Sequence, residues 1–247
     1  MRTPKILLSA ILMVALLFTT NGIAQEKEKE SYAMAEITYM LPKIGSEQDF
    51  VKGVAAHNDK YHAEAPHTAY LDNILTGKDA GWYVWIMAPC TFSDLDSKPG
   101  LGAHSDHWNK NVAPTIQKYG RTEYWRVNMD LSYYANETEA KLETLWVLDL
   151  KRGDYYRFKN LMTKIKAAYE KKGTDNIGVY DNQFYANDGR EVVIVWDSQS
   201  WSEFDDNNSI KKEYEEVHGE GSWQSMLDEW NDIVVSINSQ VWRHNVR

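Results

Sequence analysis

The run WYVWIM at residues 82–87 decides the fold, because it is apolar or aromatic at every position where a strand wet on one face would alternate with polar residues. The run VVIVW at residues 192–196 has the same character about 110 residues further along the chain. Both runs are typical of strands that are covered on both faces. We therefore predict two sheets, each with helices on one face and the other sheet on its second face.

The first run lies inside a predicted β-α-β-β-α-β unit. Phe50, Val54 and Tyr61 recur at helical spacing behind a capping box formed by Ser46 and Asp49, which predicts a helix. In chain order the unit consists of strand 36–41, this helix, strands 68–75 and 82–88, a looser helical region broken by Pro99 and Pro114, and strand 122–129.

The second run lies inside a unit with the same order of elements. Asp188-Gly189 predicts a hairpin turn, and the apolar stripe from Trp223 to Ile237 predicts an amphipathic helix. In chain order this unit consists of strand 143–150, helix 154–171, strands 178–185 and 191–196, a helical tract that ends in the stripe, and strand 240–245.

The closing strands of both units carry Trp-Arg-x-Asn, at residues 125–128 and 242–245. A shared motif at the same place in both units indicates an internal duplication. The polar stretch 136–141 separates the halves, so we predict repeats at 34–135 and 142–247. The predicted fold class is α+β, with two β-α-β-β-α-β repeats whose antiparallel sheets pack face to face in a pseudo-two-fold barrel.

The N-terminus has the pattern of a secretory signal. Arg2 and Lys5 precede the apolar run 6–18, and small residues follow at 22–24. We predict a signal peptide at 1–24 and a charged leader at 25–33. The mature protein is then exported to the periplasm or secreted, and it is soluble, since no other stretch approaches the roughly 20 apolar residues of a membrane span.

Charge and motif content restrict the function. Without Arg2 and Lys5, the formal charge of the chain moves from −9 to −11, which argues against nucleic acid or an anionic membrane surface as a partner. The sequence contains no Gly-rich phosphate loop, no Gly-x-Ser-x-Gly elbow and no His-Glu-x-x-His. The single cysteine, Cys90, is expected to be a small buried residue.

A family resemblance rests on residues 195–204 (VWDSQSWSEF) and 214–218 (YEEVH). This segment resembles the strand-to-helix part of the dimeric α/β-barrel superfamily, which includes antibiotic-biosynthesis monooxygenase-like, stress-responsive and haem-degrading proteins. The resemblance implies two ferredoxin-like units packed sheet against sheet. His218 matches the functional His of the haem-degrading members, whereas their Asn position falls in the Leu-Trp-Val-Leu stretch 145–148 and their Trp position holds Phe204.

The function implied by the resemblance is the binding of a small aromatic or hydrophobic ligand. The finer form is a monooxygenase or related oxidoreductase that needs no cofactor, with His218 as the catalytic proton-transfer residue. Two alternatives stay open, namely a non-catalytic exported interaction protein and a haem-binding protein. The sequence identifies no cofactor, and it allows a monomer or a homodimer.

Six further residues are candidates for the ligand site. His57 and Tyr61 share one face of the first helix, and His104 and His107 are spaced i, i+3 in the looser helical region. Two histidines without a third ligand do not make a metal site, so none is predicted. Trp85 and Trp196, on the two apolar runs, are the predicted walls of the pocket.

Overall fold

The computed structural model describes residues 32–247 except 186–187 and 207–208. The predicted signal peptide and most of the predicted leader lie outside these residues. In the part of the chain that is described, no helix is long and apolar enough to cross a membrane.

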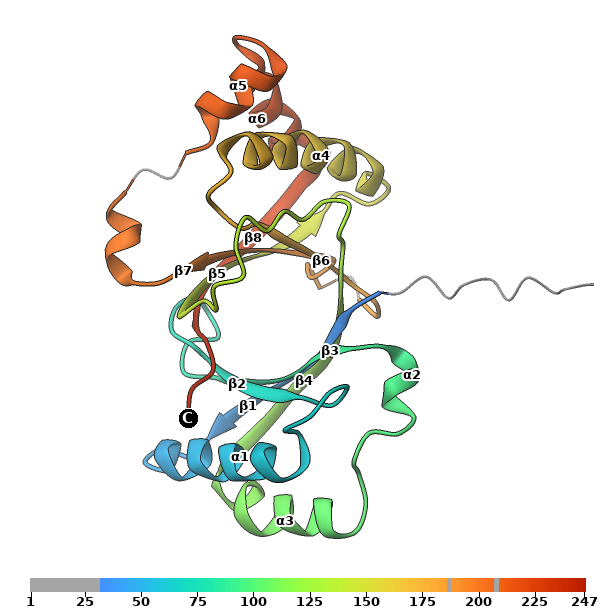
Figure 1. Ribbon diagram of the computed structural model, residues 1–247, viewed down its shortest axis with the longest axis vertical. Helices are drawn as coiled ribbons and strands as arrows, with labels where there is room; N and C mark the ends of the chain where they lie inside the picture. Colours follow the sequence, from blue (N-terminus) through green and yellow to red (C-terminus); the bar gives the residue numbers. More distant parts are fainter. Residues whose placement is uncertain (1–31, 186–187, 207–208) are drawn as a thin grey trace, which may run out of the picture. The chain divides into compact units, whose positions relative to one another are not determined.

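Eight strands form one closed antiparallel barrel (Figure 1). The strands are β1 (Met34–Pro42), β2 (Ala69–Ile74), β3 (Tyr83–Cys90), β4 (Ile116–Val127), β5 (Leu142–Leu150), β6 (Gly178–Asn182), β7 (Val192–Ser198) and β8 (Val234–Arg243). Around the barrel their order is β1-β3-β2-β8-β5-β7-β6-β4. The first four strands are thus arranged as β4-β1-β3-β2 and the last four as β8-β5-β7-β6. The pairs β2·β8 and β4·β6 join these halves.

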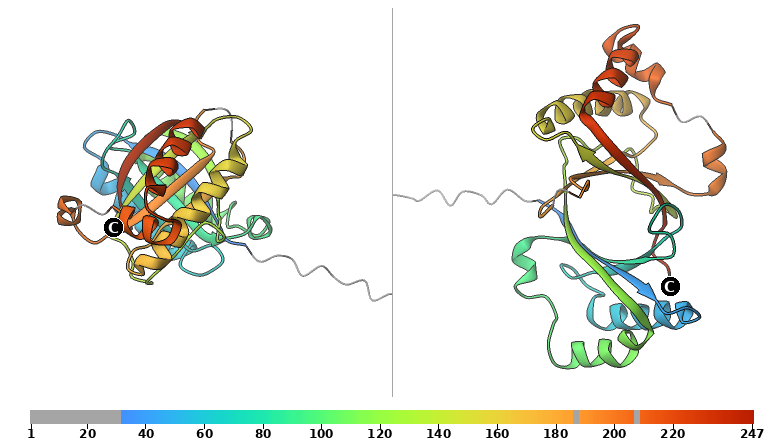
Figure 2. Two further views of the ribbon diagram at one scale, coloured as in Figure 1. Left: turned by 90° about the horizontal axis from the view of Figure 1, so that it is seen from above. Right: turned by 180° about the vertical axis from the view of Figure 1, so that it is seen from behind.

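Helices cover the outside of both halves (Figures 1 and 2). They are α1 (Glu47–Tyr61), α2 (Phe92–Leu95), α3 (Ala103–Asn111), α4 (Tyr155–Lys172), α5 (Lys211–His218) and α6 (Ser222–Ile233), with short 3-10 turns η1 (Ala113–Thr115) and η2 (Trp201–Asp205). Helices α1 and α3 lie against the half formed by β1–β4. Helices α4, α5 and α6 lie on the side of the other half.

The two apolar runs are covered on both faces, as predicted. On β3, Val84 and Ile86 belong to the apolar cluster inside the barrel, whereas Trp85 and Met87 pack with Phe50 under the helices. All four strand residues are at most 7% exposed. On β7, alternate residues divide in the same way between the interior and the helix-covered layer. The predicted barrel of two facing sheets is confirmed, and the two β-pairs at the seams close it.

Some predicted boundaries are wrong. The apolar stripe predicted to stay helical as far as Ile237 leaves the helix after Ile233, because Val234 and Ile237 pair with Leu150 and Leu148 of β5. Strand β4 begins at Ile116, well before the predicted 122, since it pairs along β1 as far as Pro42. Ser46 is the N-cap residue of α1, but its side chain makes no capping hydrogen bond.

Candidate functional site

A cavity of about 770 Å³ lies in the second half, between the outer face of the sheet and the helices α4 and α6. Its apolar wall contains four tryptophans: Trp146, Trp196, Trp223 and Trp230. Trp146 packs edge-on against Trp196, with ring centroids 5.0 Å apart, and lies 6.0 Å from Trp230. The Trp196 indole N–H donates to the Tyr169 hydroxyl at 2.7 Å, which satisfies the polar tip of this ring.

The polar part of the cavity lining contains acidic residues together with Asn, Thr, Ser and Gln side chains. It includes Asp175, Asp197, Glu203 and Asp206, and the described lining residues include no Lys, Arg, His or Cys. The Asn176 amide donates to Asp197 at 2.7 Å. Burial raises the pKa of Asp175, but hydrogen bonds from the Lys172 ammonium and the Thr174 hydroxyl outweigh burial and lower that pKa overall. The lining of the cavity therefore combines aromatic side chains with carboxyl groups.

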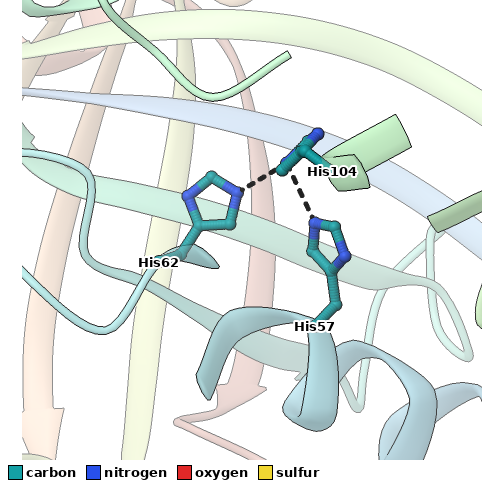
Figure 3. A group of neighbouring side chains, drawn as sticks. All are labelled: His57, His62 and His104. Atoms are coloured by element: carbon teal, nitrogen blue, oxygen red, sulfur yellow. Dashed lines mark hydrogen bonds between the residues drawn. The ribbon is translucent and has the colours of Figure 1, made fainter. Parts of the chain in front are cut away.

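A second group of functional side chains lies in the first half, where His57, His62 and His104 point toward one another (Figure 3). His57 belongs to α1, His62 follows the end of α1, and His104 belongs to α3. The Nε2 atom of His104 is 3.0 Å from His57 Nε2 and 3.1 Å from His62 Nε2. His57 and His62 are 1% and 2% exposed, so their rings are almost completely removed from water.

The close packing of α1 on α3 depends on a glycine. A Cβ atom added at Gly53 of α1 would lie 2.6 Å from the carbonyl oxygen of Asn111 at the end of α3. The missing side chain lets the two helices approach closely enough for their histidines to meet.

The outer nitrogens of these histidines are held by the protein. His62 Nδ1 lies 3.0 Å from the His67 carbonyl oxygen, and His104 Nδ1 lies 3.0 Å from the Gly100 carbonyl oxygen. A carbonyl can only accept, so both Nδ1 atoms carry the proton and donate it. His57 Nδ1 faces His107 Nδ1 at 3.2 Å.

Burial keeps two of these rings uncharged. It lowers the pKa of His57 to about 3, with further lowering by the neighbouring histidines. Burial also lowers the pKa of His62 to about 4, although the hydrogen bond to the His67 carbonyl opposes this shift. Both imidazoles are therefore neutral at neutral pH.

The structure divides the predicted ligand residues between two places. His57, Tyr61, His104 and His107 come together on the first half, where the Tyr61 hydroxyl donates to the Ala103 carbonyl at 2.8 Å.

The two predicted tryptophan walls also separate. Trp85 borders the histidines, with its ring 5.1 Å from His62 and its indole N–H donating to Asn58 at 2.9 Å. Trp196 lines the cavity of the second half. These residues therefore do not form a single pocket.

His218, the predicted catalytic residue, is brought to neither place. Its Nε2 is 3.0 Å from the carbonyl oxygen of Lys164 in α4, and its ring packs against Tyr214 with centroids 4.5 Å apart. It is not among the described residues that line the cavity. A catalytic role of His218 stays a prediction that the geometry of the cavity does not use.

Sequence reasoning missed a partly buried group of ionisable side chains at the β2·β8 seam. His244 Nδ1 lies 3.3 Å from Asp72 and 3.9 Å from Glu143. Burial lowers the pKa of His244, but the ion pair with Asp72, together with the charge of Glu143, outweighs burial and raises that pKa to about 9. His244 is part of the second Trp-Arg-x-Asn motif, which was interpreted only as a sign of duplication.

Comparison with known proteins gives matches of structure and none of sequence. No family model matches the chain, and no curated protein matches it. A proposed monooxygenase from Lactobacillus acidophilus NCFM superposes with a TM-score of 0.55 at 10% identity, over 87% of this chain and 95% of that chain. A proposed monooxygenase from Fusobacterium nucleatum subsp. nucleatum also has a TM-score of 0.55, at 9% identity, over 87% and 94% of the two chains.

The structure of a chlorite dismutase is also similar. The chlorite dismutase of Candidatus Nitrospira defluvii, in complex with imidazole, has a TM-score of 0.51 at 8% identity, over 85% of this chain and 90% of that chain. At these identities the likeness concerns the fold, and it confirms the fold that the resemblance at residues 195–204 and 214–218 implied. The chain therefore has the dimeric α/β-barrel fold, with both sheets of the barrel supplied by one polypeptide.

Proposed function

We propose that this protein binds a small molecule with an aromatic body and a cationic or hydrogen-bond-donating end in the cavity of its second half. The observation that carries the proposal is the lining of that cavity, which combines four tryptophans with four acidic side chains. Its volume of about 770 Å³ lies in the range of sites for small molecules and cofactors.

The tryptophan wall favours a planar ligand with some positive charge. Indole faces offer a large contact area and attract cations through the ring quadrupole. The carboxyl groups of the lining favour a donor or a cation and disfavour an anion. A ligand with an aromatic body and a cationic or donor group suits both kinds of lining residue.

The same chemistry does not fit haem, the alternative raised by the resemblance. The most common axial ligands of haem, His and Cys, are not among the described lining residues, and the hydroxyl of the lining Tyr169 already accepts from the Trp196 indole. Its two propionates are anionic, and the cavity faces them with Asp and Glu side chains and without a described Lys or Arg. We therefore derive no haem-dependent step.

Oxygenation of the bound compound without a cofactor is the finer activity that the resemblance implies, and it stays a prediction. Its test is oxygen consumption with whichever compound the cavity retains. Export is likewise proposed from residues 1–24, and Edman sequencing of the mature protein from its own host would locate the cleavage site.

The size of the cavity favours a ligand-binding protein over the alternative of a purely macromolecular partner. A partner-binding protein needs an exposed apolar patch, whereas the tryptophans here border a concave site.

Two experiments test the proposal. Native mass spectrometry of protein exported by its own host should reveal a retained compound with an aromatic ring and a basic group. In fluorescence titrations, tryptamine should bind at least about tenfold more tightly than indole-3-acetate, which has the same ring with a carboxylate in place of the amine.

A matched pair of variants locates the site. Trp230→Leu should weaken tryptamine binding, whereas Trp82→Leu, on the first half and outside the cavity, should leave it unchanged. Equal affinity for the amine and the carboxylate, or equal binding by both variants, contradicts the proposal.

A further inference from the structure

The histidines of the first half present a hydrogen-bonding conflict. A neutral imidazole has one N–H, and both His62 and His104 use theirs at Nδ1 on a backbone carbonyl. Their Nε2 atoms are therefore both lone-pair acceptors, yet they face each other at 3.1 Å. Two lone pairs at this distance repel unless a proton or a metal cation lies between them.

His57 brings a third nitrogen to the same point. Its Nε2 lies 3.0 Å from His104 Nε2, and its Nδ1–H can be donated to His107 Nδ1 at 3.2 Å. With that tautomer, all three outer N–H groups are satisfied by the protein and three lone pairs converge (Figure 3). The three ligand atoms lie within 4.8 Å of one another.

The spacing suits a transition-metal ion. With Zn–N bonds of about 2.0–2.1 Å in tetrahedral geometry, ligand nitrogens are about 3.3 Å apart. The two observed Nε2 separations of 3.0 and 3.1 Å differ from this value by a few tenths of an ångström.

We propose that the Nε2 atoms of His57, His62 and His104 bind a divalent first-row transition-metal ion that prefers imidazole ligands, with Zn²⁺ as the reference ion. Three neutral imidazoles suit Zn²⁺, Cu²⁺ or Ni²⁺ far better than Mg²⁺ or Ca²⁺. The third ligand that sequence reasoning lacked is His62, which lies just beyond the end of α1.

The surroundings of the three rings have the character of a metal site. The His67 and Gly100 carbonyls and His107 fix the tautomer and direction of each ligand, as outer-shell partners do in zinc proteins.

One coordination position is left over. Among the described residues, no Cys, Asp or Glu joins the three histidines in the group. A fourth position therefore falls to water or another small molecule, as in zinc sites that keep an open position. The site lies on the first half and does not depend on the cavity of the second half.

The test uses the full chain after treatment with a chelator and dialysis. The protein is titrated with Zn²⁺ alone, and binding is measured by isothermal titration calorimetry. Wild type should bind one ion per chain. His62→Ala and His104→Gln should each weaken binding by about 100-fold or more, and His107→Gln by about 10–100-fold as an outer-shell change. His218→Gln, a histidine change on the other half, should bind as wild type does.

A second measurement reports geometry and guards against misfolded variants. Co²⁺ bound to wild type should show intense visible absorption typical of tetrahedral coordination, and Zn²⁺ should abolish it. His104 is only partly buried, so His104→Gln is the variant expected to keep its fold, which circular dichroism checks. The proposal is overturned if wild type binds Zn²⁺ no more tightly than His57→Ala/His62→Ala/His104→Ala, or if folded His104→Gln binds it as wild type does.

Discussion

The buried Arg190–Glu123 ion pair links the two halves of the barrel and allows a sharp test of its energetics. Arg190, just before β7, is 3% exposed and forms two hydrogen bonds to Glu123 of β4, at 2.6 and 2.8 Å. Arg190 also donates to the Tyr39 hydroxyl at 2.8 Å, and the Trp125 indole N–H donates to Glu123 at 3.0 Å. Loss of one partner leaves the other as a buried charge.

The expected cost of Arg190→Met follows from this geometry. Breaking a buried pair by removing one partner costs about 3–5 kcal/mol of unfolding free energy. In this variant Arg121, whose Nε lies 3.4 Å from Glu123, still balances part of the Glu123 charge. We therefore expect Arg190→Met to lower the unfolding free energy by about 3 kcal/mol. The double variant Arg190→Met/Glu123→Leu removes both charges and should regain at least about 2 kcal/mol of this loss, because a well-packed apolar pair avoids the desolvation cost.

The unfolding free energies of wild type, Arg190→Met, Glu123→Leu and the double variant are measured by guanidinium unfolding, monitored by tryptophan fluorescence. The four values form a double-mutant cycle, and the coupling energy should be at least about 2 kcal/mol. The argument is refuted if the losses of unfolding free energy in the two single variants add up to the loss in the double variant to within about 0.5 kcal/mol. It is also refuted if Arg190→Met lowers the unfolding free energy by less than about 1 kcal/mol.

Two more changes have clear expected outcomes. The pKa of His244 is raised to about 9 beside Asp72 and Glu143, so the stability that its charge contributes is complete below its ordinary value of about 6.5 and is lost as the pH rises through 9. Between those pH values the unfolding free energy of wild type should therefore fall more than that of His244→Gln in guanidinium unfolding, and parallel curves would contradict this. Gly53→Ala should cost about 1–3 kcal/mol in thermal unfolding, because the new Cβ would lie 2.6 Å from the Asn111 carbonyl. An unchanged melting temperature would show that α1 and α3 can move apart freely.

Much of the fold could be predicted because its signals are local. The apolar runs at 82–87 and 192–196 indicate that both faces of these strands are covered. The order of elements around them restricts the possible topologies. The seams between the two halves could not be predicted from local signals. Strands β2 and β8 pair over a short register, with Asn73↔Arg243 and Ile74↔Trp242 as partners. No periodicity encodes a pairing between such distant segments. The end of α6 was missed for the same reason, because pairing with β5 overrides a continuous helical pattern.

The candidate sites were only partly predictable. Helical spacing places His57 with Tyr61 and His104 with His107, but it does not say that the two faces meet. That meeting depends on the close approach of α1 and α3 at Gly53. The direction of the His62 ring comes from a hydrogen bond to the His67 carbonyl, which a sequence pattern does not show.

The position of the His218 side chain could not be predicted for a different reason. It matched a family motif in sequence, whereas its Nε2 is directed to the carbonyl of Lys164. A motif places a residue on an element, but the neighbouring helix decides where the side chain points.

The closed barrel of a single chain has a consequence for how its two outer faces can evolve. If two identical chains formed such a barrel, every substitution would appear on both outer faces. The two chains would also dissociate on dilution. Here the chain segment between β4 and β5 links the two sheets covalently, so they stay together at any concentration. Because different residues of the chain form the two outer faces, each face can change without the other. That asymmetry allows one polypeptide to carry imidazoles on one flank and indoles on the opposite flank.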